Sequence, residues 1–331
     1  MLALCCSIVV LSLAEDPPVD VPFSPGVTIH FASLEEGKAE ISRPDDFTKS
    51  MSKLDVQIRL RSDKDLTPDD YIRFVTPHVT EWSNDERAKL TRILGKIRDR
   101  LKTLDLAPPF PAKILFVRTT GLEEAQAAYT RSQAIFLPAS KVGAGESGLE
   151  KLVAHELFHV LTRQAPELRE RLYAIVGYHP CPSVELPADW RDRKLTNPDA
   201  PHLDTAIELT LDGKPVQAVS LLFSRDEKYE PKEKDSLFRY LEFRLLVIDI
   251  EQGKSRARLV DGKPLLLDPH SSADFQKKIG RNTGYIIHPD EILADNFMHL
   301  IAGTPGLPNP EIVAKLKEEL AKDIKKTEPT R

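Results

Sequence analysis

One five-residue segment, His155-Glu156-Leu157-Phe158-His159, constrains this chain more than any other part of it. The surrounding pattern predicts a helix from about residue 147 to residue 164, and histidines four positions apart project from the same face of a helix. The flanking positions are apolar: Leu152, Val153, Val160 and Leu161. Because two imidazoles and a carboxylate are costly to bury unless they are paired or bind metal, the segment predicts a metal site.

The spacing of His155 and His159 suits two ligands of a single tetrahedral zinc ion. Glu156, next to the first histidine, can reach a metal-bound water and act as its general base. Zinc lowers the pKa of such a water toward about 7, which makes it a nucleophile near neutral pH. The segment therefore favours a zinc-dependent hydrolase over two core histidines with a surface glutamate between them.

A zinc enzyme of this kind needs a third protein ligand and one open position. A nearby third histidine after a glycine is excluded, since Thr162 and Ala165 stand at those positions. Glu291 and Asp295 share one face of a helix predicted from about residue 288 to residue 301, so Glu291 can bind the metal while Asp295 orients a ligand imidazole. Glu291 could instead complement the dipole of the first helical turn. The other candidates for the third ligand are His288, Asp295 and His299.

The HELFH segment, followed by Glu291 and Asp295 in an ExxxD spacing, resembles the gluzincin group of zinc metallopeptidases, in the thermolysin-like zincin clan. The resemblance covers residues 110–165 and 285–302. It implies zinc on His155, His159 and Glu291. It also implies Glu156 as the catalytic base and Asp295 as the partner of a ligand histidine.

The same resemblance implies an α+β fold with a small mixed sheet, an active-site helix and an edge strand that binds extended peptide. Residues 134–137 are placed to be that strand. This sequence departs from the family pattern in two ways: the gap between His159 and Glu291 is far longer, and the usual Asn before the glutamate is absent. Members of the group use a Tyr or His to stabilise the oxyanion, and Tyr178 is the first candidate here. The alternatives are Tyr173, His179 and Tyr285.

The chain divides by composition into five expected regions. Residues 1–14 are apolar and end in small residues before Glu15, which predicts a signal peptide and a secreted or periplasmic protein, although no basic residue precedes the apolar run. A buried N-terminal strand or helix is the alternative. The other regions are a strand and helix region (15–110), the zincin core (111–177), a β-rich insertion (178–287), and the third-ligand helix with a closing helix (288–331).

Local patterns give further expectations. Alternation of apolar and polar residues predicts a strand at 54–60, and a helix and a short strand are expected at 122–129 and 285–287. Asp-Gly-Lys-Pro occurs at 212–215 and again at 261–264, which predicts two hairpin turns.

Composition narrows the function classes. The formal net charge is −5 and no basic stripe carries interleaved aromatics, so we expect no nucleic-acid partner. Cys181 is alone once the signal is removed, so no internal disulfide is expected. We expect no stable membrane span after signal removal. The sequence thus predicts an α+β zinc metallopeptidase acting on a peptide or protein. A zinc hydrolase of a non-peptide bond and an inactive zincin-fold binding protein are the alternatives.

Overall fold

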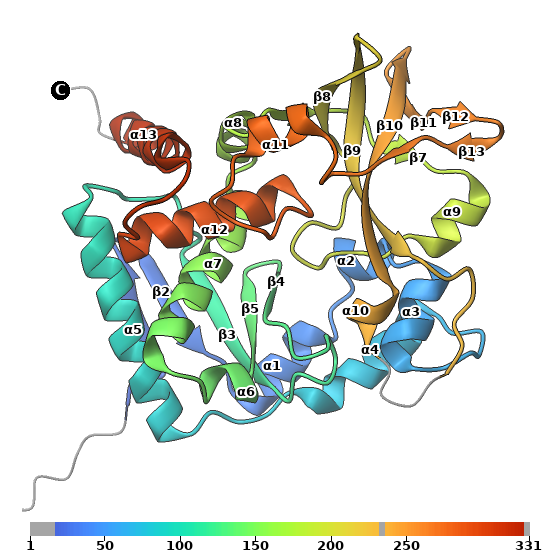
Figure 1. Cartoon of the computed structure of the whole chain (residues 1–331). Coiled ribbons are helices and arrows are strands. Elements are labelled where there is room, and N and C mark those ends of the chain that lie inside the picture. The colour runs from blue at the N-terminus through green and yellow to red at the C-terminus, as the bar shows by residue number, and fades with distance from the viewer. Residues whose placement is uncertain (1–16, 232–235, 328–331) are drawn as a thin grey trace, which may run out of the picture.

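The chain folds into an α+β structure with two larger sheets, shown by a computed structural model that describes residues 17–231 and 236–327 (Figure 1). The expected signal segment, residues 1–14, lies outside the described residues. No helix within the described ranges is long and apolar enough to cross a membrane.

The first sheet has five strands in the order β1-β2-β3-β5-β4. Its central strands β2, β3 and β5 run parallel, while β1 and β4 pair antiparallel at the two edges, so the sheet is mixed. The strands are β1 (Asp20–Ser24), β2 (Val27–Phe31), β3 (Lys113–Thr119), β4 (Tyr129–Arg131) and β5 (Ala134–Pro138).

The expected edge strand is an inner strand. Residues 134–137 belong to β5, which lies between β3 and β4 and is buried at every position. An apolar run without alternation is typical of a strand covered on both faces, which agrees with this inner place. The edge is formed by β4, whose three residues are too few to show a periodic pattern.

The second sheet is built from residues 178–267 and has the strand order β6-β8-β9-β10-β11-β7, with β14 paired to β10. Its strands, with the separate pair β12–β13, are β6 (Tyr178–Pro180), β7 (Val184–Glu185), β8 (Thr205–Leu211), β9 (Lys214–Ser224), β10 (Leu241–Glu251), β11 (Lys254–Ala257), β12 (Leu259–Val260), β13 (Lys263–Pro264) and β14 (Leu266–Leu267). The two Asp-Gly turns are confirmed: Asp212-Gly213 joins β8 to β9 and Asp261-Gly262 joins β12 to β13, with positive φ at both residues of each turn.

Helices surround the sheets. They are α1 (Leu34–Ile41), α2 (Asp46–Lys49), α3 (Lys53–Leu60), α4 (Pro68–Val75), the 3-10 turn η1 (Thr76–His78), α5 (Asn84–Thr103), α6 (Ala139–Val142), α7 (Glu146–Gln164), α8 (Pro166–Ala174), α9 (Ala188–Arg193), α10 (Leu237–Tyr240), α11 (Ala273–Ile279), α12 (Pro289–Ala302) and α13 (Pro310–Thr327). The HELFH segment lies within α7, and α12 packs directly against it (Figure 1). One hydrophobic core joins both helices to both sheets, since it contains Phe158 of α7, Phe297 of α12, Ile135 of β5 and Val247 of β10.

The expected strand at 54–60 is wrong, because these residues form helix α3. The apolar and polar residues alternate, but the polar positions are buried too. Asp55 and Arg59, four residues apart, form a buried ion pair, and Arg59 Nε also donates to Glu124 Oε1 at 2.8 Å. Because the apolar and the polar positions are both buried, and the polar groups are paired with one another, the alternation does not mark a solvent-exposed face. A helix is therefore as compatible with this pattern as a strand is.

The expected helix at 122–129 and the expected strand at 285–287 are also wrong. Residues 122–126 form turns, with positive φ at Ala125 and Gln126, and residues 285–287 lie in a loop before α12. These turns include two buried acidic residues, Glu123 and Glu124. Glu124 accepts from Tyr71 Oη at 2.7 Å as well as from Arg59, whereas neither carboxylate oxygen of Glu123 has a hydrogen-bond partner of ordinary geometry within the described chain.

Glu123 should make stability depend on pH. It is 1% exposed, and burial raises its pKa from 4.5 to about 7. Because the unfolded chain loses this proton at lower pH than the folded one, stability falls as pH rises from 4.5 to about 7 and then levels off. Glu123→Gln should gain stability relative to wild type above that window, by up to about 3 kcal/mol, and show little difference below it. Urea unfolding on both sides of the window measures this difference.

Glu124→Gln is the matched control. It removes a paired buried carboxylate, so it should lower stability at both ends of the pH window. A Glu123→Gln variant whose stability difference from wild type is the same at low and high pH would contradict the assignment of a buried carboxyl whose pKa is raised by desolvation.

Candidate metal centre

Helices α7 and α12 bring together side chains that are far apart in the sequence. His155 Nε2 lies 3.1 Å from Glu291 Oε2, and His159 Nε2 lies 3.4 Å from the same oxygen. One ligand atom from each of these three residues falls within 4.8 Å of the others, so the group could hold a metal ion. His159 and Glu291 are each 1% exposed.

One atom of this group is left without a hydrogen bond. His159 Nε2 is buried and has no partner of hydrogen-bond geometry within residues 17–231 and 236–327, although it faces Glu291. The ion-pair contact with Glu291 offsets only part of the hydration that this buried nitrogen has lost. A cation between the imidazoles and Glu291 would satisfy it, so the donor set fits a metal.

Two further acids fix the orientation of the imidazoles. Asp295 Oδ1 lies 2.9 Å from His155 Nδ1, and Asp290 Oδ2 lies 2.6 Å from His159 Nδ1. Tyr173 Oη donates to the other oxygen of Asp290 at 2.8 Å. Carboxylates that hold the outer nitrogen of a ligand histidine set its tautomer and leave Nε2 free for metal. The structure thus places Asp295 where the sequence predicted it, and adds Asp290.

Glu156 projects from α7 beside the same group. Thr130 Oγ1 of the edge strand β4 donates to Glu156 Oε2 at 2.9 Å. Ligand atoms of Glu156, His159 and Asp199 form a second group within 4.8 Å. Burial, the largest cause, raises the pKa of both Glu156 and Asp199. Glu156 is therefore held by a fixed donor, and its carboxylate lies beside His159.

Electrostatics at the centre favour positive charge. Burial alone would lower the pKa of both imidazoles, but the neighbouring carboxylates outweigh it. The pKa of His155 rises to about 10 through hydrogen bonds to Asp295 and Glu291. The pKa of His159 rises well above its usual value through the charges of three nearby acids. In turn, the imidazoles hold the pKa of Glu291 well below its usual value, although burial opposes this shift.

A cavity of about 370 Å³ opens onto the centre, with Glu156, Asp199, Tyr285 and Glu291 among its lining residues. The ring of Tyr285 stacks on His155, with centroids 6.2 Å apart, and the residue is 43% exposed. A tyrosine that borders both the cavity and a ligand imidazole can reach a substrate held there.

Other predicted residues lie away from the centre. Tyr178 is in β6, 1% exposed, with its hydroxyl 2.9 Å from Ser220 Oγ, so the structure does not bring it to the cavity. His288 caps α12, since its Nδ1 accepts from the Asp290 amide at 3.1 Å. His299 lies near Thr304 Oγ1 and the carbonyl of Asn282, at 3.1 Å from each. These contacts give both histidines structural roles.

Three residues at the centre carry no signal in the sequence that predicts their place there. Asp290 precedes Glu291 in the first turn of α12, where an acidic residue is common because it complements the helix dipole, so its sequence position alone does not mark it. Asp199 lies in a Pro-rich segment and Thr130 lies in the short strand β4. Neither residue belongs to a sequence motif whose spacing would predict a role at the centre. Only the fold brings them to Glu156.

One comparison with known protein families found a similarity to part of this region. A family model described as the eCIS core domain, a domain of extracellular contractile injection systems, matches residues 121–167. The match covers β4, β5, α6 and α7 but not α12. It lends no support of its own to the gluzincin resemblance. No curated protein and no solved structure matches the chain.

Asp290 and Asp295 should control metal affinity without touching the metal. Asp290→Asn and Asp295→Asn each leave an imidazole with a weaker acceptor, so each should weaken binding of Zn²⁺ by about 10- to 100-fold. Competition with a chromogenic chelator measures the affinity.

Tyr173→Phe is the control for this prediction. It keeps the Asp290 carboxylate and removes one hydrogen bond from it, so its effect on Zn²⁺ affinity should be smaller. Unchanged affinity in both Asp290→Asn and Asp295→Asn would show that these imidazoles do not hold the ion.

Proposed function

We propose that this chain is a zinc-dependent hydrolase whose substrate is a peptide or protein. One observation carries the proposal: His155, His159 and Glu291 direct their ligand atoms at one buried point, with Glu156 beside it. Two imidazoles and one carboxylate are a ligand set that catalytic zinc sites use.

The charge of the centre supports a cation there. Five carboxylates surround two imidazoles: Glu156, Asp199, Asp290, Glu291 and Asp295. The neighbouring acids raise the pKa of both imidazoles, and binding of a divalent cation would release the protons that they carry. The nitrogen donors favour zinc over magnesium or calcium, which prefer oxygen ligands.

The residues around the point have separable tasks. When bound, zinc polarises the bond to be cleaved and makes a water acidic. Glu156 takes a proton from the attacking water and returns it to the leaving nitrogen, which is the work of a general base and then a general acid. Thr130 holds the Glu156 carboxylate in place during both transfers. Tyr285, stacked on His155, donates a hydrogen bond to the oxygen on which negative charge develops.

The peptide substrate rests on the gluzincin resemblance and on β4. The edge strand borders the centre through Thr130, and an edge strand can pair with an extended peptide. The signal-like residues 1–14 support a secreted or periplasmic location. The alternative is a zinc hydrolase of a non-peptide bond. A protein that binds zinc but cleaves no peptide would favour this alternative. A binding protein without activity has no need for an oriented Glu156.

Glu156→Gln separates catalysis from metal binding. The variant keeps the shape of the side chain but cannot accept a proton, so hydrolysis of a peptide library should fall by about 10²- to 10⁴-fold. Zinc content, measured by elemental analysis, should stay at the wild-type level. Glu291→Ala should do the reverse and lose zinc, because it removes a ligand. Activity that survives Glu156→Gln, or zinc that survives Glu291→Ala, would contradict the assigned roles.

The two tyrosines give a second test. Tyr285→Phe should lower kcat by about 10²- to 10³-fold with little change in KM, since the hydroxyl acts only on charge that develops during reaction. Tyr178→Phe, which breaks only the contact with Ser220, should leave kcat unchanged. Loss of kcat in Tyr178→Phe without loss in Tyr285→Phe would restore Tyr178 as the donor.

A further inference from the structure

One acidic residue beside the centre has no part in the predicted ligand set or in proton transfer. Ligand atoms of Asp199, Glu156 and His159 lie within 4.8 Å of one another. The predicted ligands His155 and Glu291 are not part of this second group. The Asp199 carboxylate therefore lies on the His159 side of the metal position, where it forms part of the wall of the cavity and not of the ligand set.

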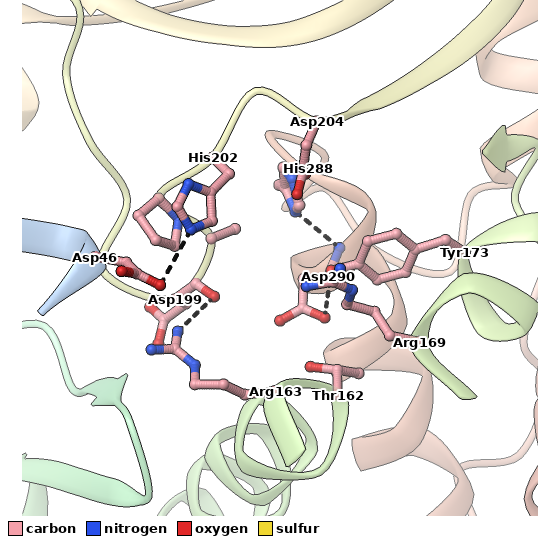
Figure 2. A pocket seen from close by; sticks show the side chains of 12 residues that line it. Asp46, Thr162, Arg163, Arg169, Tyr173, Asp199, His202, Asp204, His288 and Asp290 are labelled. Atoms are coloured by element: carbon pink, nitrogen blue, oxygen red, sulfur yellow. Dashed lines mark hydrogen bonds and ion pairs between the residues drawn. The ribbon is translucent and has the colours of Figure 1, made fainter. Parts of the chain in front are cut away.

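Contacts of the side chain and of the backbone fix Asp199, which lies in a turn, residues 197–201, between α9 and β8. The Thr130 amide donates to Asp199 Oδ1 at 2.6 Å, and the Asp199 amide donates to Asn197 Oδ1 at 3.0 Å. Arg163 Nη2 donates to the Asp199 carbonyl at 2.9 Å. Figure 2 shows this last contact from a second cavity, of about 180 Å³, with Arg163 reaching the turn from α7. The carboxylate is thus fixed relative to the helix that carries Glu156.

The second oxygen of this carboxylate is available to a substrate. The Thr130 amide is the one hydrogen-bond donor that the described chain provides to the Asp199 side chain, and it bonds to Oδ1. Asp199 lines the cavity of about 370 Å³ that opens onto the centre. A carboxylate oxygen in this position can accept a charge-assisted hydrogen bond from a cationic group of the substrate.

The contact between Thr130 and Asp199 limits how a peptide can lie on the edge strand. Thr130 is the middle residue of β4, and its amide points away from β5 toward Asp199. A peptide paired with β4 would need this amide for one of its own carbonyls. Because the Asp199 carboxylate already occupies the amide, an extended peptide cannot continue along β4 past this residue. A substrate chain that reaches the centre along β4 must therefore end near Asp199.

Charge favours the amino end of a peptide at this place over the carboxyl end. Five carboxylates surround the two imidazoles, and a divalent metal offsets only two of those five charges. At neutral pH the amino end of a peptide is mostly an ammonium group and the carboxyl end is an anion. The ammonium group would reduce the repulsion between Asp199 and Glu156, whereas a second carboxylate would increase it.

Another part of the same cavity carries the opposite charge. Lys141 and Lys151 line it, and both residues are exposed. Lys151 precedes Glu156 by five positions, which is about 7.5 Å along α7. A peptide with its amino end at Asp199 would therefore leave the cavity past the two lysines, where its later residues and its carboxyl end meet positive charge.

The reach of Asp199 fits one amino-acid residue. Two bonds separate the α-nitrogen of an amino acid from its carbonyl carbon, so these two atoms are about 2.5 Å apart. Asp199 lies within 4.8 Å of ligand atoms of both Glu156 and His159. An ammonium group bound by Asp199 therefore presents the carbonyl of its own residue to the centre, and the bond that follows this carbonyl is the first peptide bond of the chain.

We propose that the centre is an aminopeptidase site, in which Asp199 binds the α-ammonium group of the substrate and Glu156 acts at the first peptide bond. Water adds across that bond: its oxygen joins the carbonyl carbon, the C–N bond breaks, and Glu156 passes a proton of the water to the leaving nitrogen. The products are one free amino acid and a peptide shorter by one residue. This inference rests on the proposed function and names the class of its substrate.

A short peptide with a free amino end and its N-acetylated copy test the inference on the full chain with Zn²⁺ bound. Wild type should release single amino-terminal residues from the free peptide. Its kcat/KM for the acetylated copy should be about 10- to 100-fold lower, because acetylation removes the charged hydrogen bond to Asp199. Mass spectrometry of the products identifies which bond is cleaved.

Asp199→Asn keeps an acceptor for the Thr130 amide and removes the negative charge. The variant should raise KM for the free peptide and lower kcat/KM by a similar factor, while its rate on the acetylated copy stays near that of wild type. Its zinc content should not change, because Asp199 is outside the ligand set. Asp204→Asn is the matched control, since Asp204 is on the same segment and lines only the second cavity among those described, so it should match wild type.

The outcomes separate this inference from the proposed function. Equal kcat/KM of wild type on the free and the acetylated peptide would overturn the inference and leave the proposed peptidase intact. A preference for the free peptide that survives unchanged in Asp199→Asn would show that Asp199 does not bind the ammonium group. If zinc binds but wild type cleaves neither peptide, the peptidase proposal fails, and the inference fails with it.

Discussion

The attraction between α7 and α12 is the interaction on which the rest of the structure depends. Neither the imidazoles of one helix nor the acids of the other could be buried alone, because an unpaired buried charge costs several kcal/mol. Paired, they let Phe158 and Phe297 pack in the shared core, with ring centroids 5.7 Å apart. The polar centre and the apolar packing therefore stabilise each other, and the ligand geometry is set by helix packing rather than by loops.

The acidic residues at this contact outnumber the imidazoles. Burial raises the pKa of Glu156 and Asp199, so these carboxyls tend toward the protonated form when only the two imidazoles offset them. A divalent cation would add positive charge at the point where the acids meet and return them to the ionised form that a base or an ammonium-binding group requires. The buried charge thus supports both the proposed metal and the proposed use of Glu156.

The sequence could predict residues whose roles depend on spacing within one helix. His155 and His159 share a face of α7, and Glu291 and Asp295 share a face of α12, so their grouping followed from helical periodicity. Residues 54–60 could not be assigned in this way, because buried pairing of Asp55 and Arg59 makes apolar alternation uninformative. Asp199 and Thr130 reach the centre only through the tertiary path of a turn and an edge strand, for which a single sequence holds no signal.

The base of the Asp199 turn shows how a distant part of the fold bears on the site. Thr196, one residue before the turn, donates its amide to Asp55 Oδ2 at 2.9 Å and accepts at its carbonyl from Arg59 Nη2 at 2.8 Å. This end is therefore fixed by a buried ion network on α3. Beyond Thr196, hydrogen bonds to Arg163, Glu291 and Thr130 hold the turn in place. The position of Asp199 beside Glu156 and His159 therefore depends on the buried ion network of α3 as well as on α7 and β4.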